Sequence, residues 1–181
     1  AVDFQKIPGS PIDYWLGVNL IELFGKPNLA TKYSIGSGLS TSDNERFVRY
    51  IWEISHERIA FEVASTEECQ DRNEKWFLFQ KGGEFRKWFG NLMHVVNWQN
   101  DGEEIKHWVT NNPKDPDTTH WSRRIFNTDL YFKKGLTWST ISSGLISFRL
   151  SEKGTMISNA AGGIFGFGTD SELLNVSRAL N

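Results

Sequence analysis

Cysteine is almost absent from this sequence of 181 residues, which contains Cys69 alone. A single cysteine cannot form a disulfide within the chain, so packing and hydrogen bonds must hold the fold together. The acidic neighbours Glu67, Glu68 and Asp71 would raise the pKa of the thiol, whereas a reactive cysteine needs a lowered one. We therefore expect neither a disulfide scaffold nor a catalytic thiol.

Long apolar runs are missing as well. No stretch approaches the roughly 20 consecutive apolar residues that a membrane-spanning helix requires. No cationic and apolar signal peptide opens the chain. Together with the single cysteine, these features predict a cytoplasmic protein. The chain starts at Ala1 rather than at methionine and stops just after a helical pattern, so we expect a piece of a larger protein.

The motifs of common metal and catalytic sites are also absent. The chain has four histidines, at positions 56, 94, 107 and 120. They show none of the short spacings of zinc ligands. No Gly-x-Ser-x-Gly elbow occurs, and the nearest approach, at residues 36–38, is better explained as a flexible loop apex. The acid pairs at 67–68 and 103–104 are expected to be solvated rather than to cleave glycosides.

A glycine-rich stretch at 162–168 precedes the last predicted helix, where backbone N–H groups could hold an anion. It lacks the P-loop lysine and does not match the dinucleotide fingerprint, so a tightly packed connection from strand to helix is the better interpretation. Residues 111–114 superficially resemble the Asn-Pro-Pro-aromatic motif of amino-methyltransferases, but they lack the second proline and the aromatic residue. We expect no catalytic residue, metal or cofactor in this chain.

The charge balance shows no basic excess, because 20 Lys and Arg face 22 Asp and Glu. A module that binds nucleic acid through its phosphates usually carries more bases than acids. The distribution is uneven, however: acids prevail between residues 52 and 76, whereas bases gather at 81–87 and 123–134. The chain therefore either presents one positive face or spreads its charges evenly over a solvated surface.

Aromatic residues are present in excess, with eight Trp and thirteen Phe. Each ring buries ~150–250 Å², so many of them belong in the core, and the others suit a contact surface. A chain of this length suffices for one substantial core but not for two average domains. We therefore expect one domain in which most tryptophans are internal.

Hydrophobic periodicity predicts more short strands than helices. Helices are predicted at 11–24, from Asp101 to Asn111, and at 169–180, with a further helical turn after Asp43. Strands are predicted at 31–35, 49–54, 75–80, 94–98, 130–132, 137–138, 147–150, 155–157 and 164–167. Loops or turns are predicted at 36–42, 82–83 and 112–117. The expected fold class is α+β, a mixed and strand-rich single domain with several short helices.

Polar and aromatic blocks carry a resemblance to a known family. The blocks are residues 4–15, 38–47, 81–88, 96–102 and 137–139. They combine glycines that let the backbone approach a partner, Asn, Ser and Arg side chains that make directional hydrogen bonds, and flat Trp rings. In this order they resemble the C-terminal half of large adenine-specific DNA methyltransferases, namely the PglX family of BREX phage-defence systems and related fused restriction-modification enzymes.

The resemblance implies that residues 1–181 form the target-recognition domain of a larger enzyme, with the helix at 11–24 as its connection to the missing methyltransferase domain. That domain would bind S-adenosylmethionine and methylate adenine N6, and this chain should not catalyse by itself. The implied partners are double-stranded DNA, the methyltransferase domain and other defence-system proteins, but no membrane. The implied fold is that of a DNA methyltransferase target-recognition domain.

Side chains that suit DNA occur throughout these blocks and the basic clusters. Arg and Lys suit guanine, Asn and Gln suit adenine, and Ser and Thr suit phosphates. The candidate DNA-binding residues are Ser37, Ser40, Thr41, Ser42, Asn44, Arg46, Lys81, Arg86, Lys87, Asn97, Asn100, Arg123, Arg124, Lys133 and Lys134.

The loop at 37–46 and the turn at 81–88 are expected to face the DNA groove, whereas the last four of these residues are expected to hold phosphates. Asn97 and Asn100 either read bases or support those loops. An alternative assigns the family-typical blocks to the scaffold and the specificity to residues 115–125.

Two other function classes remain open. A protein-interaction module would use exposed aromatic residues to dock on a catalytic domain or on another defence protein. It would bind DNA weakly. A carbohydrate-binding β-rich domain would stack sugars on tryptophan, although the absence of a secretion signal counts against it.

Overall fold

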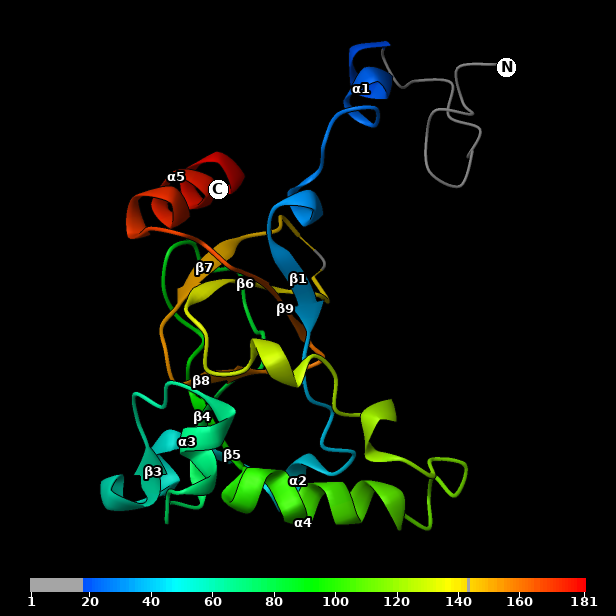
Figure 1. Cartoon of the computed structure of the whole chain (residues 1–181), viewed down its shortest axis with the longest axis vertical. Helices are drawn as coiled ribbons and strands as arrows, with labels where there is room; N and C mark the ends of the chain where they lie inside the picture. The colour runs from blue at the N-terminus through cyan, green and yellow to red at the C-terminus, as the bar shows by residue number, and fades with distance from the viewer. Residues whose placement is uncertain (1–17, 143) are drawn as a thin grey trace. The chain divides into compact units, whose positions relative to one another are not determined.

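The structure is a computed structural model, which describes residues 18–142 and 144–181 (Figure 1). Contacts divide the chain into two units, residues 1–33 and residues 34–181. The first unit contributes helix α1 (Val18–Leu23) and the 3-10 helix η2 (Leu29–Thr31). The helix expected over 11–24 can be followed only along α1, since residues 11–17 lie outside the described part of the chain. No helix in that part is long and apolar enough to cross a membrane.

The second unit confirms the expected α+β class, with two sheets and short helices. The first sheet is antiparallel and has the order β1-β9-β6-β7. Its strands are β1 (Ser34–Ser37), β6 (Gly135–Ser139), β7 (Phe148–Ser151) and β9 (Ala161–Phe165). Leu136 on β6 lies opposite both Leu150 and Ile164, so aliphatic side chains pack across three strands.

The second sheet is built around strand β4, which is buried at every position. Its strands are β2 (Val48–Tyr50), β3 (Ile59–Ala60), β4 (Trp76–Gln80), β5 (His94–Asn97) and β8 (Thr155–Ile157). β5 pairs with β4 in antiparallel fashion, whereas β3 and β8 pair in parallel with successive parts of β4. Because β8 and β9 are consecutive, the chain ties the two sheets together.

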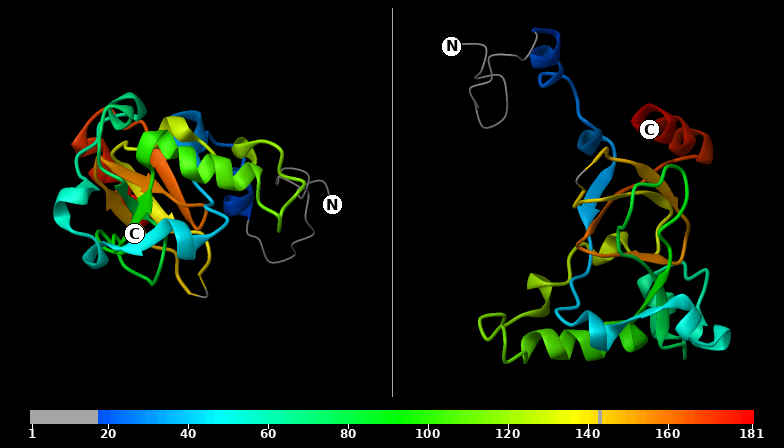
Figure 2. Two further views of the ribbon diagram at one scale, coloured as in Figure 1. Left: turned by 90° about the horizontal axis from the view of Figure 1, so that it is seen from below. Right: turned by 180° about the vertical axis from the view of Figure 1, so that it is seen from behind.

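The α-helices described in this unit are α2 (Asn44–Phe47), α3 (Thr66–Gln70), α4 (Gln99–Thr110) and α5 (Asp170–Leu180). Three of these four begin at a side-chain cap; α4 has none, and Asn100 and Asp101 in its first turn have left-handed backbone angles. Asp43 accepts a hydrogen bond from the Arg46 N–H, and Thr169 accepts one from the Glu172 N–H, so both predicted caps are confirmed. Within unit 2, α2 and α4 lie at the end opposite α5 (Figures 1 and 2).

Several predicted strands are wrong in part or in whole, because 3-10 turns mimic their alternation. The strand at 31–35 begins only at Ser34, and that at 49–54 ends at Tyr50 and continues as the 3-10 helix η3 (Ile51–Glu53). No strand forms at 130–132. The other 3-10 helices are η4 (His56–Arg58), η5 (Trp121–Arg123) and η6 (Thr128–Leu130).

The loop expected at 36–42 is also partly wrong, since Gly36 and Ser37 belong to β1. Gly38 is not a free loop apex: its N–H donates to the carbonyl of Ser158 at 3.2 Å, and the next N–H, of Leu39, donates to Ile157 at 3.0 Å. These residues therefore extend the second sheet past β8. The glycine serves an internal close approach rather than an approach to an external partner.

Trp98 is the largest side chain of the core and is fully buried. The edge of its ring meets Tyr131, with the ring centroids 5.6 Å apart. Trp76 is also buried, whereas Trp52 is 66% exposed. Some of the many aromatic residues therefore pack in the core and others are exposed on the surface, as the composition indicated.

Cys69 is buried on α3 and donates a hydrogen bond to the carbonyl of Trp98 (3.7 Å). Burial is the main cause that raises the pKa of the thiol to about 11. The acidic contribution comes from Asp101 and not from Glu67, Glu68 or Asp71, so the expected direction is right and its expected cause is wrong.

Alkaline pH is therefore expected to destabilise the fold through Cys69. The folded pKa is raised, so the protonated thiol stabilises the fold fully below the unfolded pKa of 9.0, and this contribution is lost as the pH rises toward 11. Chemical denaturation of the protein and of Cys69→Ala between pH 8 and pH 11 measures the effect. The variant should lose less stability over this range, and equal losses would contradict the prediction.

Candidate nucleic-acid interface

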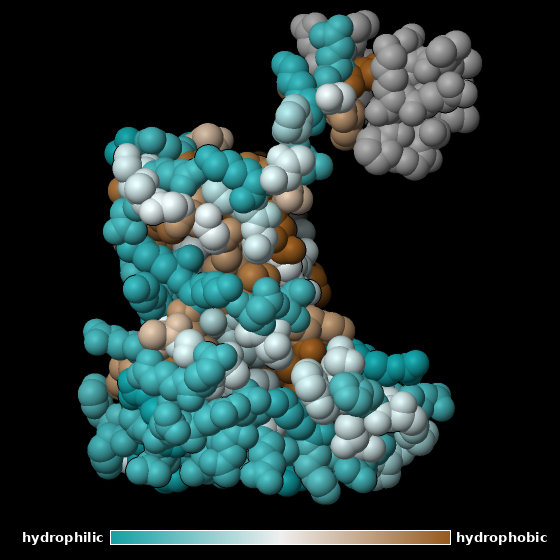
Figure 3. Space-filling model, viewed as in Figure 1, coloured by the Kyte–Doolittle hydropathy of each residue, from teal (hydrophilic) through white to brown (hydrophobic). Residues whose placement is uncertain are grey.

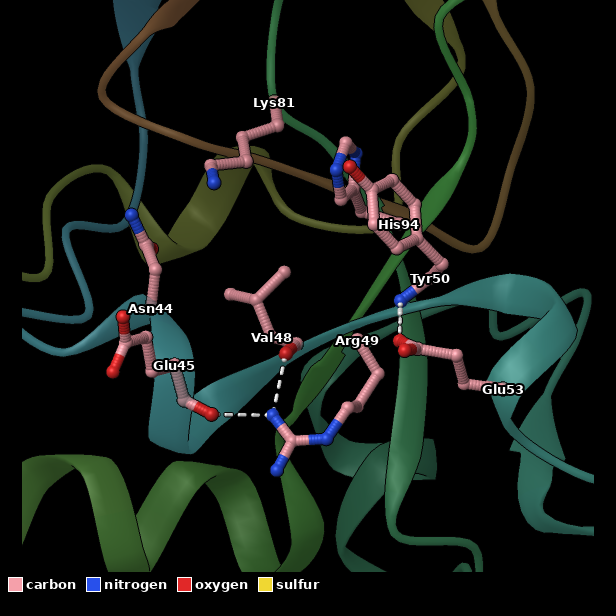
Figure 4. Close-up of a pocket in the computed structure, with 8 residues that line it drawn as sticks. All are labelled: Asn44, Glu45, Val48, Arg49, Tyr50, Glu53, Lys81 and His94. Carbon is pink, nitrogen blue, oxygen red and sulfur yellow. Dashed lines mark hydrogen bonds between the residues drawn. The ribbon is translucent and has the colours of Figure 1, made fainter.

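A depression of about 370 Å³ lies between α2, the two antiparallel strands β2 and β5, and the residue that follows β4 (Figure 4). Its lining residues are Asn44, Glu45, Val48, Arg49, Tyr50, Glu53, Lys81 and His94. We call it the α2–β2 pocket. It brings together two of the predicted DNA-binding residues, Asn44 and Lys81, which are far apart in the sequence.

The α2 cap positions Asn44. The Thr41 hydroxyl donates to Asn44 Oδ1 at 2.9 Å, and Asp43 caps the helix that begins at Asn44. Thr41 is only 3% exposed, so it supports the loop, whereas Ser42 and Asn44 are exposed. The Lys81 amine and the Asn44 amide both point into the pocket (Figure 4).

Arg49 and His94 complete the polar lining of the α2–β2 pocket. Arg49 Nη1 donates to the backbone carbonyls of Glu45 (2.5 Å) and Val48 (2.7 Å), and its guanidinium lies 5.7 Å from the Trp76 ring. Burial, aided by the nearby charge of Lys81, lowers the pKa of His94 below its usual value. At neutral pH the imidazole is therefore an uncharged hydrogen-bonding group, and the cations of the pocket are Arg49 and Lys81.

Glu104 on α4 fixes two more predicted residues. Its carboxylate accepts from Arg46 Nη2 (3.0 Å) and from Asn97 Nδ2 (2.7 Å), and Lys75 lies 3.5 Å from it. The hydrogen bond from Arg46 is the largest cause that lowers the pKa of Glu104. Asn97 is 4% exposed, so its side chain lies inside the fold in contact with Glu104.

Arg46 remains half exposed beside this carboxylate. Its guanidinium also lies 4.9 Å from the centroid of the Trp108 ring. The two neighbouring acids have different partners. Glu104 accepts from Arg46 and Asn97, whereas Glu103 accepts from the exposed Asn100 (3.2 Å). Figure 3 shows that the surface over α3 and α4 is predominantly hydrophilic.

The segment at 81–93 leaves β4 and passes along the edge of the first sheet. The Trp88 N–H donates to the Phe148 carbonyl (3.1 Å), and the Trp88 carbonyl accepts from Leu150 (2.8 Å). Gly82 has φ +81°, a conformation that glycine adopts readily, but residues 81–83 do not form the turn that was predicted there. Arg86 and Lys87 are exposed on this segment, and the Lys87 amine donates to the Asn181 carbonyl.

Arg123 and Arg124, two of the predicted phosphate-binding residues, donate hydrogen bonds to the loop that contains Asp115 and Asp117. Arg124 donates from Nε (3.1 Å) and Nη2 (2.5 Å) to Asp115 Oδ2, and this contact is the main cause that lowers the pKa of Asp115. Arg123 donates to the Asp117 carbonyl (3.1 Å) but is exposed. Within the described residues, Arg124 therefore holds the 115–124 loop together, and Arg123 is the more accessible cation.

Lys133 and Lys134 line a separate depression of about 270 Å³ together with Lys153, which the sequence reasoning missed. Lys134 lies 3.0 Å from Asp170 and 3.7 Å from Glu152. The hydrogen bond to Asp170 is the largest cause that raises the pKa of Lys134. Lys133 is exposed. This second basic depression is not part of the α2–β2 pocket.

The remaining candidates lie on the strand and loop that lead to α2. The carbonyl of Ser37 accepts from Asn127 Nδ2 (2.7 Å), and the Ser40 N–H donates to the carbonyl of Arg124 (2.7 Å). The structure thus divides the predicted residues among several places. Asn44 and Lys81 converge in one pocket, Arg46 and Asn97 share Glu104, and the cations at 123–124 and 133–134 lie elsewhere.

Sequence reasoning missed Arg49, Tyr50 and His94 as residues of the α2–β2 pocket. The signal was present as a tyrosine and a tryptophan two residues apart after Arg49, but it was interpreted as strand alternation. Among the described residues, no group of three or more His, Cys, Asp and Glu side chains could hold a metal ion.

Residues 111–114, which superficially resemble part of an amino-methyltransferase motif, follow α4. Asn112 is buried at the end of α4, and its Oδ1 accepts from the Lys114 N–H at 3.0 Å. Its side chain therefore serves a local turn, in keeping with the missing second proline and aromatic residue.

Comparison with known proteins places these features in one context. No family model matches the chain. An adenine-specific methyltransferase named PglX, from Lacticaseibacillus casei (strain Zhang), is 36% identical over 170 residues, which are 93% of this chain and 13% of that protein. An adenine-specific methyltransferase named BrxX, from Escherichia coli O9:H4 (strain HS), is 35% identical over 165 residues, which are 90% of this chain and 12% of that protein.

The chain therefore spans only 13% and 12% of the lengths of these two relatives. The expected resemblance is confirmed, and it extends along the chain as the five blocks indicated. Over most of its length, this chain is similar to one segment of the much longer adenine-specific methyltransferases PglX and BrxX.

Proposed function

We propose that this chain is the part of a bacterial N6-adenine DNA methyltransferase that recognises duplex DNA, in a BREX-type phage-defence or restriction-modification system. The whole of residues 1–181 belongs to this target-recognition domain, and the segment at 11–24, which the sequence predicts to be helical, connects it to the rest of the enzyme. Methyl transfer and S-adenosylmethionine binding are functions of that remainder. The enzyme acts in the cytoplasm, where its DNA lies.

The observation that carries this proposal is the convergence of Asn44 and Lys81 in the α2–β2 pocket. An amide can pair with adenine in the major groove, and a lysine can hold guanine or a phosphate. Arg49 adds a second cation to the same lining, and the exposed Arg46 lies on the same short helix as Asn44. The similarity to adenine-specific methyltransferases supplies the substrate class.

Salt-dependent binding to duplex DNA tests the proposal. The purified chain is titrated into fluorescent mixed-sequence duplex DNA at several salt concentrations, with dextran and a sugar mixture as competitors. We expect affinity to fall steeply with salt, because bound phosphates release counterions. Lys81→Ala should reduce the slope of log affinity against log salt by about 0.9, the value of one phosphate contact.

Lys114→Ala is the matched control, since Lys114 is an exposed lysine outside the α2–β2 pocket. An equal effect of both substitutions would mean diffuse attraction rather than a site. Absence of DNA binding at low salt would contradict the proposal. In that case, a complex with the separately expressed catalytic part would favour the protein-interaction alternative.

A further inference from the structure

Three aromatic rings contact one another beside the α2–β2 pocket, which two of them, Tyr50 and His94, line. The ring centroids of Tyr50 and Trp52 are 4.5 Å apart, and the rings are within 10° of parallel. The centroid of His94 lies 4.9 Å from that of Tyr50, with the ring planes inclined at 30°. Tyr50 and His94 face each other in the register of β2 and β5, so the sheet itself sets their contact. We call these three residues the ring stack.

The backbone around Trp52 is fixed on both sides. The Tyr50 N–H donates to Glu53 Oε2 (2.7 Å), which closes η3, and the Ile51 N–H donates to the Met93 carbonyl (2.9 Å). Ile51 and Ile54 pack against a small buried cluster of the second sheet. Trp52 lies between these two anchors, so its ring position needs little further ordering when a ligand binds.

Trp52 is the most exposed tryptophan of the described residues, at 66%. A ring that stacks on Tyr50 with one face and is exposed to this extent offers its outer face to a flat partner. The adjoining pocket supplies two cations, Arg49 and Lys81, and the Asn44 amide. Of its two acids, Glu53 is already engaged by the Tyr50 N–H.

We propose that the outer face of Trp52 stacks on an unpaired nucleobase of bound DNA, with Lys81 placed for a neighbouring phosphate. This inference rests on the proposed DNA-binding function and adds a preference to it: the chain binds duplex DNA that contains one unpaired base more tightly than a perfect duplex. Stacking on an aromatic side chain strengthens binding by roughly 5- to 150-fold for each base, and every base has a flat face that can take part.

A fluorescence experiment tests this preference directly. Two duplexes of the same sequence are compared, one perfect and one with a single bulged 2-aminopurine, whose emission is quenched when it stacks on another ring. The chain should bind the bulged duplex at least about 5-fold more tightly and quench the probe. Trp52→Ala should abolish both effects and leave the affinity for the perfect duplex unchanged, whereas Trp52→Phe should retain part of both.

Phe89→Ala is the matched control, because Phe89 is 64% exposed and lies outside the α2–β2 pocket. It should leave the preference and the quenching intact. Thermal melting of each variant confirms that an exposed ring has been removed without loss of the fold.

The outcomes separate this inference from the proposed function. Equal binding of the two duplexes, or equal weakening of both by Trp52→Ala, would overturn the stacking role and leave duplex recognition standing. Displacement of the bulged duplex by a soluble glucan would overturn it in favour of a sugar platform. Absence of any DNA binding would overturn both proposals.

Discussion

Gly38→Ala is expected to lower the free energy of unfolding by about 3 kcal/mol, the upper end of the cost of overpacking a core. A Cβ atom at this position would lie 2.0 Å from the backbone oxygen of Ile157 and 2.7 Å from its Cγ1. The oxygen cannot move away cheaply, because the same stretch of backbone pairs with Leu39 and with β4. Urea titration measures the loss as a lower midpoint with an unchanged slope.

Gly144→Ala is the control for this prediction. A Cβ atom at Gly144 would meet no described atom within 4 Å, so the change should stay within about 0.5 kcal/mol. If the two variants unfolded at the same urea concentration, the close approach of residue 38 to β8 would not exist in solution. The test also bears on function, since Gly38 belongs to a block that resembles methyltransferases and precedes the α2–β2 pocket.

Arg149→Met is expected to raise the free energy of unfolding by about 1–3 kcal/mol. Arg149 is fully buried on β7, and its Nη2 donates to Ser139 Oγ at 3.2 Å. Nε and Nη1 have no hydrogen-bond partner among the described residues. Burial removes the hydration of the guanidinium and so lowers the pKa of Arg149 below its usual value. Methionine keeps most of the volume and removes the charge.

Arg149→Ala separates the charge from the packing. It removes the same charge but leaves a cavity, so it should be clearly less stable than Arg149→Met. Urea titration of the three proteins gives both differences. A methionine variant that is no more stable than the unsubstituted protein would contradict the prediction and show that the guanidinium finds partners in solution, such as ordered water.

The sequence predicted best those elements whose signal is local. Strands β4 and β5 and the caps Asp43 and Thr169 follow from apolar runs or capping residues, and the structure confirms them. The strand predicted at 130–132 is wrong, because the short apolar run of Leu130, Tyr131 and Phe132 resembles a buried strand in sequence alone. Phe132 instead has φ +65° and is fully buried, a conformation that only tertiary packing sustains.

The candidate site could be predicted only in its composition. Asn44 and Lys81 were predicted from residue type, and both lie in blocks that resemble methyltransferases. Their convergence depends on the pairing of β2 with β5 and of β5 with β4, which joins segments far apart in the chain. The same pairing places His94 on Tyr50 and so creates the ring stack, for which no local pattern exists.

By itself, then, the sequence determined the α+β class, the absence of a disulfide scaffold and the resemblance to adenine-specific methyltransferases, because composition, periodicity and ordered blocks are properties of the linear chain. Only the tertiary structure decided which polar groups are buried, such as Asn97, and which cations are already neutralised, such as Arg124. The burial of Asn97 and the pairing of Arg124 depend on neighbours that are distant in sequence or that a turn brings close. Burial and charge pairing are set by packing in three dimensions.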